Sequence, residues 1–297
     1  TVKIGINFKT GKNAMAWKIG NVSITPVIEL DISVDPSFTL PDATPENLAP
    51  DFDWLKPHFV DRDGKLKFRV QALLVESCGH KIIIDTCVGN DKERSEPVFD
   101  RLNGPFIEDI AKSGFDRKEV DIVVCTHLHY DHIGWNTMKV NGEWIPTFPN
   151  ARYLIAQPEF EYCRSQKEDF WVKAFGDSVA PVFEAGLVDL VDSNYQITPE
   201  LRMFPTPGHT PGHCSVVISS QGEEAIITAD VMHHPCQCAH PEWECVADTS
   251  HEQAQMTRRE FLERVGDTDI LVIGTHWSAP KPVSVTKSKT AWKVEIS

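Results

Sequence analysis

The segment 126–132 reads Thr126-His127-Leu128-His129-Tyr130-Asp131-His132, so three histidines and one aspartate fall within six residues. It follows the apolar run 120–125, whose β-branched residues predict a short buried strand. Side chains just past the C-terminal end of such a strand lie where open α/β sheets bind their ligands. Idle polar side chains would be costly to bury at this place, so we favour a metal site over an ordinary polar loop.

The spacing of the motif predicts two neighbouring ligand groups. His127 and His129 are two residues apart, so on an extended chain both imidazoles face the same way. Asp131 and His132 follow on a turn and can point toward a second position nearby. Imidazole and carboxylate together suit zinc, iron, manganese or cobalt. One metal ion can therefore bind the first pair and a second ion the next pair.

The order His-x-His-x-Asp-His after a strand resembles the signature of the metallo-β-lactamase superfamily. Later single residues stand in the order that this family uses: His213 in the segment 207–213, Asp230 after the apolar run 225–229, and His276 after the run 270–275. Asp85 follows the run 81–84, where the family usually carries a supporting aspartate. The resemblance covers about residues 22 to 277 and is specific for fold and metal but weakly specific for substrate.

The resemblance implies an αββα sandwich with an N-terminal loop extension, whereas the sequence pattern alone predicts only a mixed α/β fold. We expect an N-terminal extension at residues 1–21 and a single metallo-β-lactamase-like domain at residues 22–297. Hairpin strands are expected at 68–77 and 81–85, and again in the second half of the chain at 187–191, 201–204, 214–219 and 224–228. The clearest helix is predicted at 252–265, from the apolar stripe that includes Ala254, Phe261 and Val265.

The family resemblance also implies a role for each site residue. The first metal would take His127, His129 and His213; the second would take Asp131, His132 and His276; Asp230 would bridge both metals together with a water. Asp85 would orient a ligand histidine by a hydrogen bond, although a simple turn-capping role stays open. His209 lies in a Pro/Gly turn and is expected to be structural. Two divalent ions are implied, with zinc first and iron, manganese or cobalt as alternatives.

In this scheme a metal-bridging hydroxide attacks an electrophilic carbonyl or phosphoryl centre. Asp131 or Asp230 would pass a proton to the leaving group. His233 stands three residues after Asp230, where acyl-homoserine lactonases commonly have tyrosine, and this departure resembles methyl parathion hydrolase and its relatives. We expect His233 to hydrogen-bond the substrate oxygen; the alternative is a solvated loop histidine.

These features favour a metal-dependent hydrolase of carboxylic esters or lactones, similar to the acyl-homoserine-lactone hydrolases. A phosphotriesterase similar to methyl parathion hydrolase is the alternative in the same site. Non-heme iron redox chemistry is less favoured, because the complete second ligand group is present. The aromatic-rich segment 35–64 is expected to form a long loop that either walls an apolar pocket, makes a dimer contact or packs on its own domain.

Composition bounds the partners. The chain has 297 residues, 41% of them hydrophobic and 24% charged, which is typical of a globular protein. The net charge of -14 and the lack of a dense Lys/Arg cluster argue against a nucleic-acid partner. No apolar run approaches the roughly 20 residues that span a membrane, and no signal peptide is recognised. The aromatic-rich segment 35–64 and the family resemblance imply a small apolar or amphiphilic substrate, and the resemblance also makes a homodimer possible.

The eight cysteines contain no C-x-x-C pair, so we interpret them as reduced thiols. Together with the missing signal peptide, this predicts a cytoplasmic protein. Cys236 and Cys238 lie two residues apart and close in sequence to Asp230. A third metal or a redox role for this pair stays open.

Overall fold

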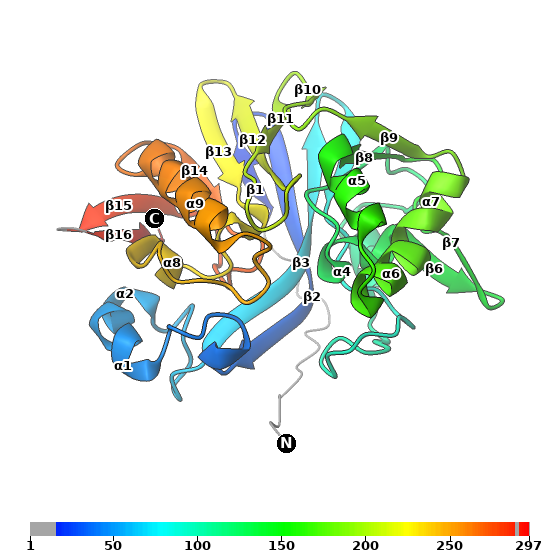
Figure 1. Cartoon of the computed structure of the whole chain (residues 1–297). Helices are drawn as coiled ribbons and strands as arrows, with labels where there is room; N and C mark the ends of the chain where they lie inside the picture. Colours follow the sequence, from blue (N-terminus) through cyan, green and yellow to red (C-terminus); the bar gives the residue numbers. More distant parts are fainter. Residues whose placement is uncertain (1–15, 289–290, 297) are drawn as a thin grey trace.

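The computed structural model describes residues 16–288 and 291–296. Two β-sheets face each other in the centre, with α5, α6 and α7 on one side and α8 and α9 on the other (Figure 1). The predicted αββα sandwich is therefore confirmed. Residues 1–15 of the predicted N-terminal extension lie outside the described residues.

The first sheet has seven strands, with β1 to β4 antiparallel and β4, β5, β8 and β9 parallel. In spatial order these are β1 (Trp17–Ile19), β2 (Val22–Val34), β3 (Leu66–Ser77), β4 (His80–Ile84), β5 (Ile122–Cys125), β8 (Arg152–Ala156) and β9 (Val188–Val191).

The second sheet has five strands, of which the last two run parallel. They are β10 (Gln196–Thr198), β11 (Leu201–Pro205), β12 (Cys214–Ser220), β13 (Glu223–Ile227) and β14 (Leu271–Ile273). Two hairpins stand apart from both sheets: β6 (Thr137–Val140) with β7 (Glu143–Pro146), and β15 (Ser284–Ser288) with β16 (Ala291–Glu295).

The α-helices are α1 (Pro45–Leu48), α2 (Phe52–Leu55), α3 (Phe106–Lys112), α4 (Tyr130–Ile133), α5 (Gln157–Ser165), α6 (Asp169–Ala174), α7 (Ala180–Glu184), α8 (Cys236–Ala239) and α9 (His251–Val265). Short 3-10 turns are η1 (Pro36–Phe38), η2 (Ala49–Asp51), η3 (Gly134–Asn136) and η5 (Ala229–Val231), and η4 (Phe175–Val179) is a π-helical turn. Among the described residues, no helix combines the length and the apolar character that crossing a membrane requires.

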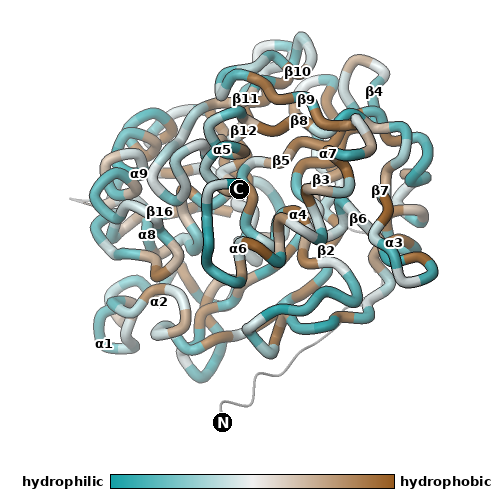
Figure 2. The backbone as a smooth tube through the Cα atoms, turned by 45° about the vertical axis from the view of Figure 1, so that its right-hand side comes forward, coloured by the Kyte–Doolittle hydropathy of each residue, from teal (hydrophilic) through white to brown (hydrophobic). Residues whose placement is uncertain are grey.

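The two sheets are held together by the side chains between them. Val124 of the first sheet belongs to the same buried cluster as Val216 and Ile227 of the second. β5 is buried on both faces, because β4 and β8 flank it within the sheet and further layers cover it. In Figure 2 the hydrophobic residues concentrate in these inner strands, and the hydrophilic ones in the outer helices and turns.

The parallel pairing explains where chemistry can collect. β4, β5 and β8 end at one edge of the first sheet, and the parallel pair β13 and β14 ends together in the second. Asp85, His127, Asp230 and His276 each follow one of these strand ends within three residues. The carboxyl ends of four strands therefore deliver site residues to one edge of the sandwich.

Helix α9 begins one residue before the predicted helix and ends at the predicted residue. Ser250 caps it by accepting a hydrogen bond from the Gln253 backbone N–H. Ala254, Phe261 and Val265 are buried, so the predicted apolar stripe faces the interior.

Three parts of the fold differ from the sequence prediction. β9 was expected in the second half, yet it pairs parallel with β8 as the outermost strand of the first sheet. Within the predicted extension, Trp17–Ile19 forms an edge strand paired with β2. The segment 35–64 is not a plain loop, because it contains α1, α2 and two 3-10 turns. Leu48, Leu55 and Phe59 of this segment are buried in the core.

Candidate metal centre

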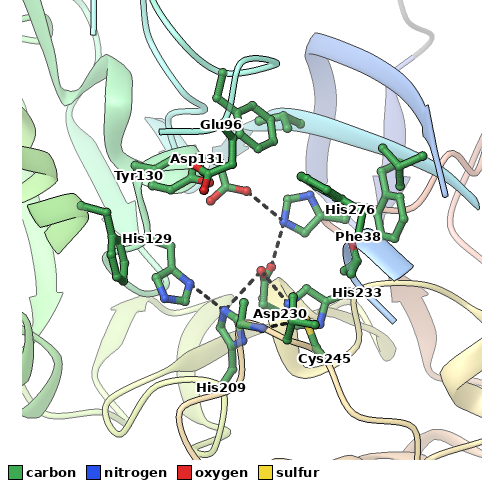
Figure 3. Close-up of a pocket in the computed structure, with 18 of the residues that line it drawn as sticks. Phe38, Glu96, His129, Tyr130, Asp131, His209, Asp230, His233, Cys245 and His276 are labelled. Carbon is green, nitrogen blue, oxygen red and sulfur yellow. Dashed lines mark hydrogen bonds and ion pairs between the residues drawn. The ribbon is translucent and has the colours of Figure 1, made fainter. Parts of the chain in front are cut away.

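The carboxylate of Asp230 lies at the centre of a histidine cluster (Figure 3). Five histidines place a ring nitrogen between 3.2 and 3.9 Å from one of its oxygens: His276 at 3.2 Å, His132 and His233 at 3.3 Å, His209 at 3.5 Å and His127 at 3.9 Å. Asp230 itself is buried. These side chains come from both sheets, so the cluster forms only when the sandwich is assembled.

The donor atoms fall into two groups. In the first half-site, His129 Nδ1 lies 3.2 Å from His127 Nε2 and 2.8 Å from His209 Nε2. In the second half-site, His132 Nε2 lies 3.1 Å from His276 Nε2, and Asp131 Oδ2 is 3.6 and 3.5 Å from the same two atoms. Nitrogens bound tetrahedrally to one zinc ion at about 2.0–2.1 Å would lie about 3.3 Å apart. Both half-sites therefore have the spacing of a metal ligand set.

The outer ring nitrogens of three histidines each face an oxygen acceptor: His132 Nδ1 lies 2.8 Å from Asp85 Oδ2, His209 Nδ1 2.9 Å from Asp248 Oδ1, and His276 Nδ1 2.7 Å from the Arg69 carbonyl oxygen. An imidazole that donates from Nδ1 has a lone pair at Nε2 when it is neutral. All three Nε2 atoms point toward Asp230. The donor set is thus prepared for a cation.

The electrostatics of the first half-site also favour metal binding. Burial lowers the pKa values of His127 and His129 well below the ordinary histidine value, and it lowers the pKa of His209. These rings therefore stay neutral at neutral pH, which is the protonation state in which histidine binds metals.

In the second half-site, protons and metal cations compete for the ring nitrogens of His132 and His276. Burial alone would lower the pKa of His132, but the carboxylates of Asp230, Asp131 and Asp85 outweigh it and raise that pKa well above the ordinary value. Asp230 likewise outweighs burial and raises the pKa of His276. The same carboxylates favour any cation at these nitrogens. Asp230 Oδ1 lies 3.2 Å from His276 Nε2, so this oxygen faces the second half-site and can serve as a further ligand atom.

The structure places His209 and His213 differently from the arrangement that the family resemblance implied. His213 Nε2 accepts a hydrogen bond from the Asp230 backbone N–H at 2.9 Å, and Nδ1 lies 2.9 Å from the Thr206 carbonyl oxygen. Both ring nitrogens of His213 are therefore engaged with the backbone, and His213 positions Asp230 instead of facing the cluster. His209, which was expected to be structural, supplies the third nitrogen of the first half-site. The physical reason is that His213 directly precedes β12, whereas His209 lies on the free turn before it.

Asp85 lies behind His132, and its backbone adopts a left-handed conformation with φ 57°. Its two oxygens accept hydrogen bonds from the Thr126 backbone N–H at 2.9 Å and the Thr126 hydroxyl at 2.8 Å, besides contacting His132. A left-handed backbone is unfavourable for a residue with a Cβ, so the surrounding contacts hold it in place.

The turn after His132 packs tightly on the segment after Asp85. The Gly134 N–H donates to the Cys87 carbonyl oxygen at 2.7 Å. A Cβ placed on Gly134 would lie 1.7 Å from the Val88 carbonyl oxygen, so only glycine fits between these two backbones. Trp135 lies away from the cavity, because it is buried, stacks on Phe106 and donates from Nε1 to Glu29.

A cavity of about 400 Å³ opens above Asp131 and Asp230. Its floor is polar, whereas its walls are mostly apolar and come from β2, β3, α6 and three connecting segments. The apolar wall residues include Ile32, Val34, Phe38, Phe68, Val70, Phe99, Phe170, Trp171 and Val246. Phe38 comes from the segment 35–64, so one aromatic residue of that segment does line the pocket.

Three functional residues were missed by sequence reasoning. Glu159, at the start of α5, accepts hydrogen bonds from the Leu128 N–H at 2.9 Å and the Gly212 N–H at 3.1 Å, which ties together the two histidine-bearing loops. Asp248 and Arg258 form a buried pair behind His209. The partners of Glu159 and Asp248 are distant in sequence, so no local pattern marked these residues.

Cys236 and Cys238 lie on α8 and are buried, but neither lines the cavity. The eight cysteines are free thiols. Cys245 is the cysteine that reaches the cavity wall, next to His233.

Comparison with known proteins agrees with the fold. The model of the metallo-beta-lactamase superfamily matches residues 67–276, which is more than half of the chain and contains every residue of both half-sites. The chain therefore belongs to the metallo-beta-lactamase superfamily.

An N-acyl homoserine lactonase from a Bacillus species is 25% identical over 171 residues, which cover 52% of this chain and 60% of that relative. The match thus spans about 60% of the relative's length. The solved structure of AidC, described as a dizinc quorum-quenching lactonase in complex with a product, has a TM-score of 0.77 at 22% identity and covers 95% of this chain and 97% of that one. Hydrolase AbOPH has a TM-score of 0.77 at 20% identity, with 96% and 98% covered. These two structures share the fold.

Proposed function

We propose that the protein is a metal-dependent hydrolase that opens lactones or cleaves carboxylic esters with an apolar acyl part. The observation that carries the proposal is the apolar-walled cavity placed directly over the two half-sites. Such a cavity suits an amphiphilic substrate whose polar end reaches the floor while its acyl part contacts the walls. The curated relatives named as N-acyl homoserine lactonases support the same class of substrate.

The cofactor we propose is a pair of divalent cations, with zinc as the expected metal. His127, His129 and His209 would hold one ion, Asp131, His132 and His276 the other, and Asp230 would contact both. When bound, such cations supply Lewis acidity that makes water a better nucleophile and stabilises negative charge on the carbonyl oxygen.

The chain's own residues supply orientation and proton transfer in this proposal. The apolar walls would hold the acyl part of the substrate. Asp131 is the more exposed of the two central carboxylates, at 19% against 4% for Asp230. It is therefore placed to take the proton of the attacking water and to return it to the leaving oxygen as the carbon–oxygen bond breaks.

The function is tested by following acid release in a pH-stat, with zinc-loaded protein and with chelated protein. The panel holds a long-chain acyl-homoserine lactone, simple lactones, aryl esters and an aryl phosphotriester. We expect hydrolysis of the lactone or ester substrates that disappears on chelation and returns with zinc. Full activity in the chelated protein would contradict the proposal. If a phosphotriester were the fastest substrate, the phosphotriesterase alternative would be favoured. If no substrate of the panel were hydrolysed, redox chemistry would be favoured.

His233 is proposed to hydrogen-bond the substrate oxygen. It is buried in the cavity wall, and its Nε2 lies 3.3 Å from Asp230 Oδ2, so one edge of the ring faces the cavity floor. Both half-sites are complete without it.

Replacing His233 by phenylalanine is expected to lower kcat by about 100-fold, the usual effect of losing one donor to developing negative charge. The metal content, measured by atomic emission, is expected to stay unchanged. His80→Phe serves as the control, since His80 is exposed on the β3–β4 turn. Loss of bound metal in His233→Phe would instead make His233 part of the metal site.

A further inference from the structure

Two buried aspartates stand behind the metal-facing histidines, one for each half-site. Asp85 Oδ2 lies 2.8 Å from His132 Nδ1, and Asp248 Oδ1 lies 2.9 Å from His209 Nδ1. Both carboxylates are 1% exposed. They reach the centre from different directions, because Asp85 follows β4 in the first sheet and Asp248 precedes α9.

Asp248 is held in turn by Arg258 of α9. The Arg258 guanidinium is buried, and its Nη2 lies 3.2 Å from Asp248 Oδ2. The other donors of the same guanidinium reach three backbone carbonyls, those of Val231 at 3.1 Å, Pro241 at 2.7 Å and Trp243 at 3.0 Å. One side chain therefore fixes the segment 231–248 near its beginning, near its middle and at its end.

The segment 231–248 begins next to Asp230 and ends at the partner of His209. Between these ends it carries His233, Cys245 and Val246 into the cavity wall. The position of this wall and the direction of the His209 ring are consequently set by the same arginine. Neither Asp248 nor Arg258 lines the cavity floor, so both act through the residues that they hold.

We propose that Asp248, held by Arg258, is the positioning residue of the first half-site, as Asp85 is for the second half-site. The inference rests on the proposed metal function of the cluster. A carboxylate that accepts the Nδ1 proton fixes the tautomer and ring direction of a histidine and makes Nε2 a better ligand. Each carboxylate touches one histidine of one half-site, so its removal should affect that half-site alone.

The test compares Asp248→Asn and Asp85→Asn in the full chain. Zinc affinity is measured by competition with a chromophoric chelator, and the absorption spectrum of cobalt-loaded protein reports the geometry of each ion. We expect each variant to weaken one of two bound ions by about 10–100-fold and to leave the other within threefold. The cobalt band lost in Asp248→Asn should match the band lost in His209→Ala, and that lost in Asp85→Asn should match His276→Ala.

Glu224→Gln is the matched control. Glu224 of β13 forms an ion pair at 2.9 Å with Arg264, which lies on α9 as Arg258 does, and this pair is away from the cavity. It is expected to bind both ions as the unchanged protein does. If Asp248→Asn does not fold, Arg258→Lys replaces it, since lysine keeps the charge but cannot contact all four acceptors. It is expected to weaken the same ion.

Equal weakening of both ions by Asp248→Asn, or no weakening, would overturn the inference while leaving the proposed function intact. If the unchanged protein bound no cation in the same titration, the proposed function would fail first. The two failures are therefore distinguished by the unchanged protein alone.

Discussion

Replacing Asp230 by alanine is expected to lower kcat/KM for the preferred lactone or ester by on the order of a thousandfold, together with the bound metal. The buried Asp230 carboxylate is the negative charge that both half-sites share, with His132 Nε2 3.3 Å from one oxygen and His276 Nε2 3.2 Å from the other. Without it, cations in the two half-sites would repel each other with no carboxylate between them. Initial rates in the pH-stat and metal stoichiometry are measured on the same preparation.

Asp269→Ala is the control for this change, since Asp269 is an exposed aspartate that does not line the cavity. It is expected to keep full rate and full metal content. Asp230→Asn adds a second comparison, because it keeps the shape of the side chain while removing its charge. An Asp230→Ala protein that retained both ions and more than a tenth of the original kcat/KM would refute a central role for this carboxylate.

The Gly134→Ala variant is expected to lose about 3 kcal/mol or more of unfolding free energy, or to fail to fold. The added methyl group would lie 1.7 Å from the carbonyl oxygen and 1.9 Å from the carbonyl carbon of Val88. Backbone atoms on both sides cannot rotate away as a long side chain can. The turn after His132 and the segment after Asp85 must therefore separate, which also disturbs the second half-site.

Urea unfolding at a fixed zinc concentration measures this effect, since bound metal would otherwise shift the midpoint. Gly176→Ala is the matched control, because a Cβ on Gly176 meets nothing within 4 Å. It is expected to change the unfolding free energy by less than about 1 kcal/mol. Equal midpoints for Gly134→Ala and the unchanged protein would show that the two backbones are not held together in solution.

The local sequence was sufficient to predict those parts of the fold and the site whose signal comes from residues close together in the chain. The strand 122–125, the helix 251–265 and the His127–His132 cluster each have their signal within one short segment. The strand β9 was expected among the hairpin strands of the second half of the chain, but it joins the first sheet. Sequence order does not show which sheet a strand joins. The parallel pairing of β9 with β8 requires the helical connection α5 to α7 between them, and that topology is visible only in three dimensions.

The difference between the expected and the observed positions of His209 and His213 has another origin. Both histidines lie in the turn Pro207-Gly208-His209-Thr210-Pro211-Gly212-His213, and both are buried. Only their hydrogen-bond partners separate them, since His213 binds the Asp230 backbone and His209 binds Asp248, 39 residues away. His209 lies four residues beyond the end of β11 and His213 lies eight, so the rule that placed His127 just past its strand end also favours His209.

The unequal anchoring of the two cavity walls has an evolutionary consequence. The wall from segment 231–248 is tied through Asp248 to His209, which faces the proposed metal site. Insertions or substitutions in this wall would therefore move a proposed metal ligand. The adjoining wall contains Phe38, which is 39% exposed and belongs to a connection with no residue in either half-site; it meets the segment 231–248 where the Val246 N–H donates to the Thr39 carbonyl oxygen at 3.0 Å. Divergence toward new acyl groups would therefore accumulate first in the connection between β2 and β3, while the segment 231–248 would stay constrained.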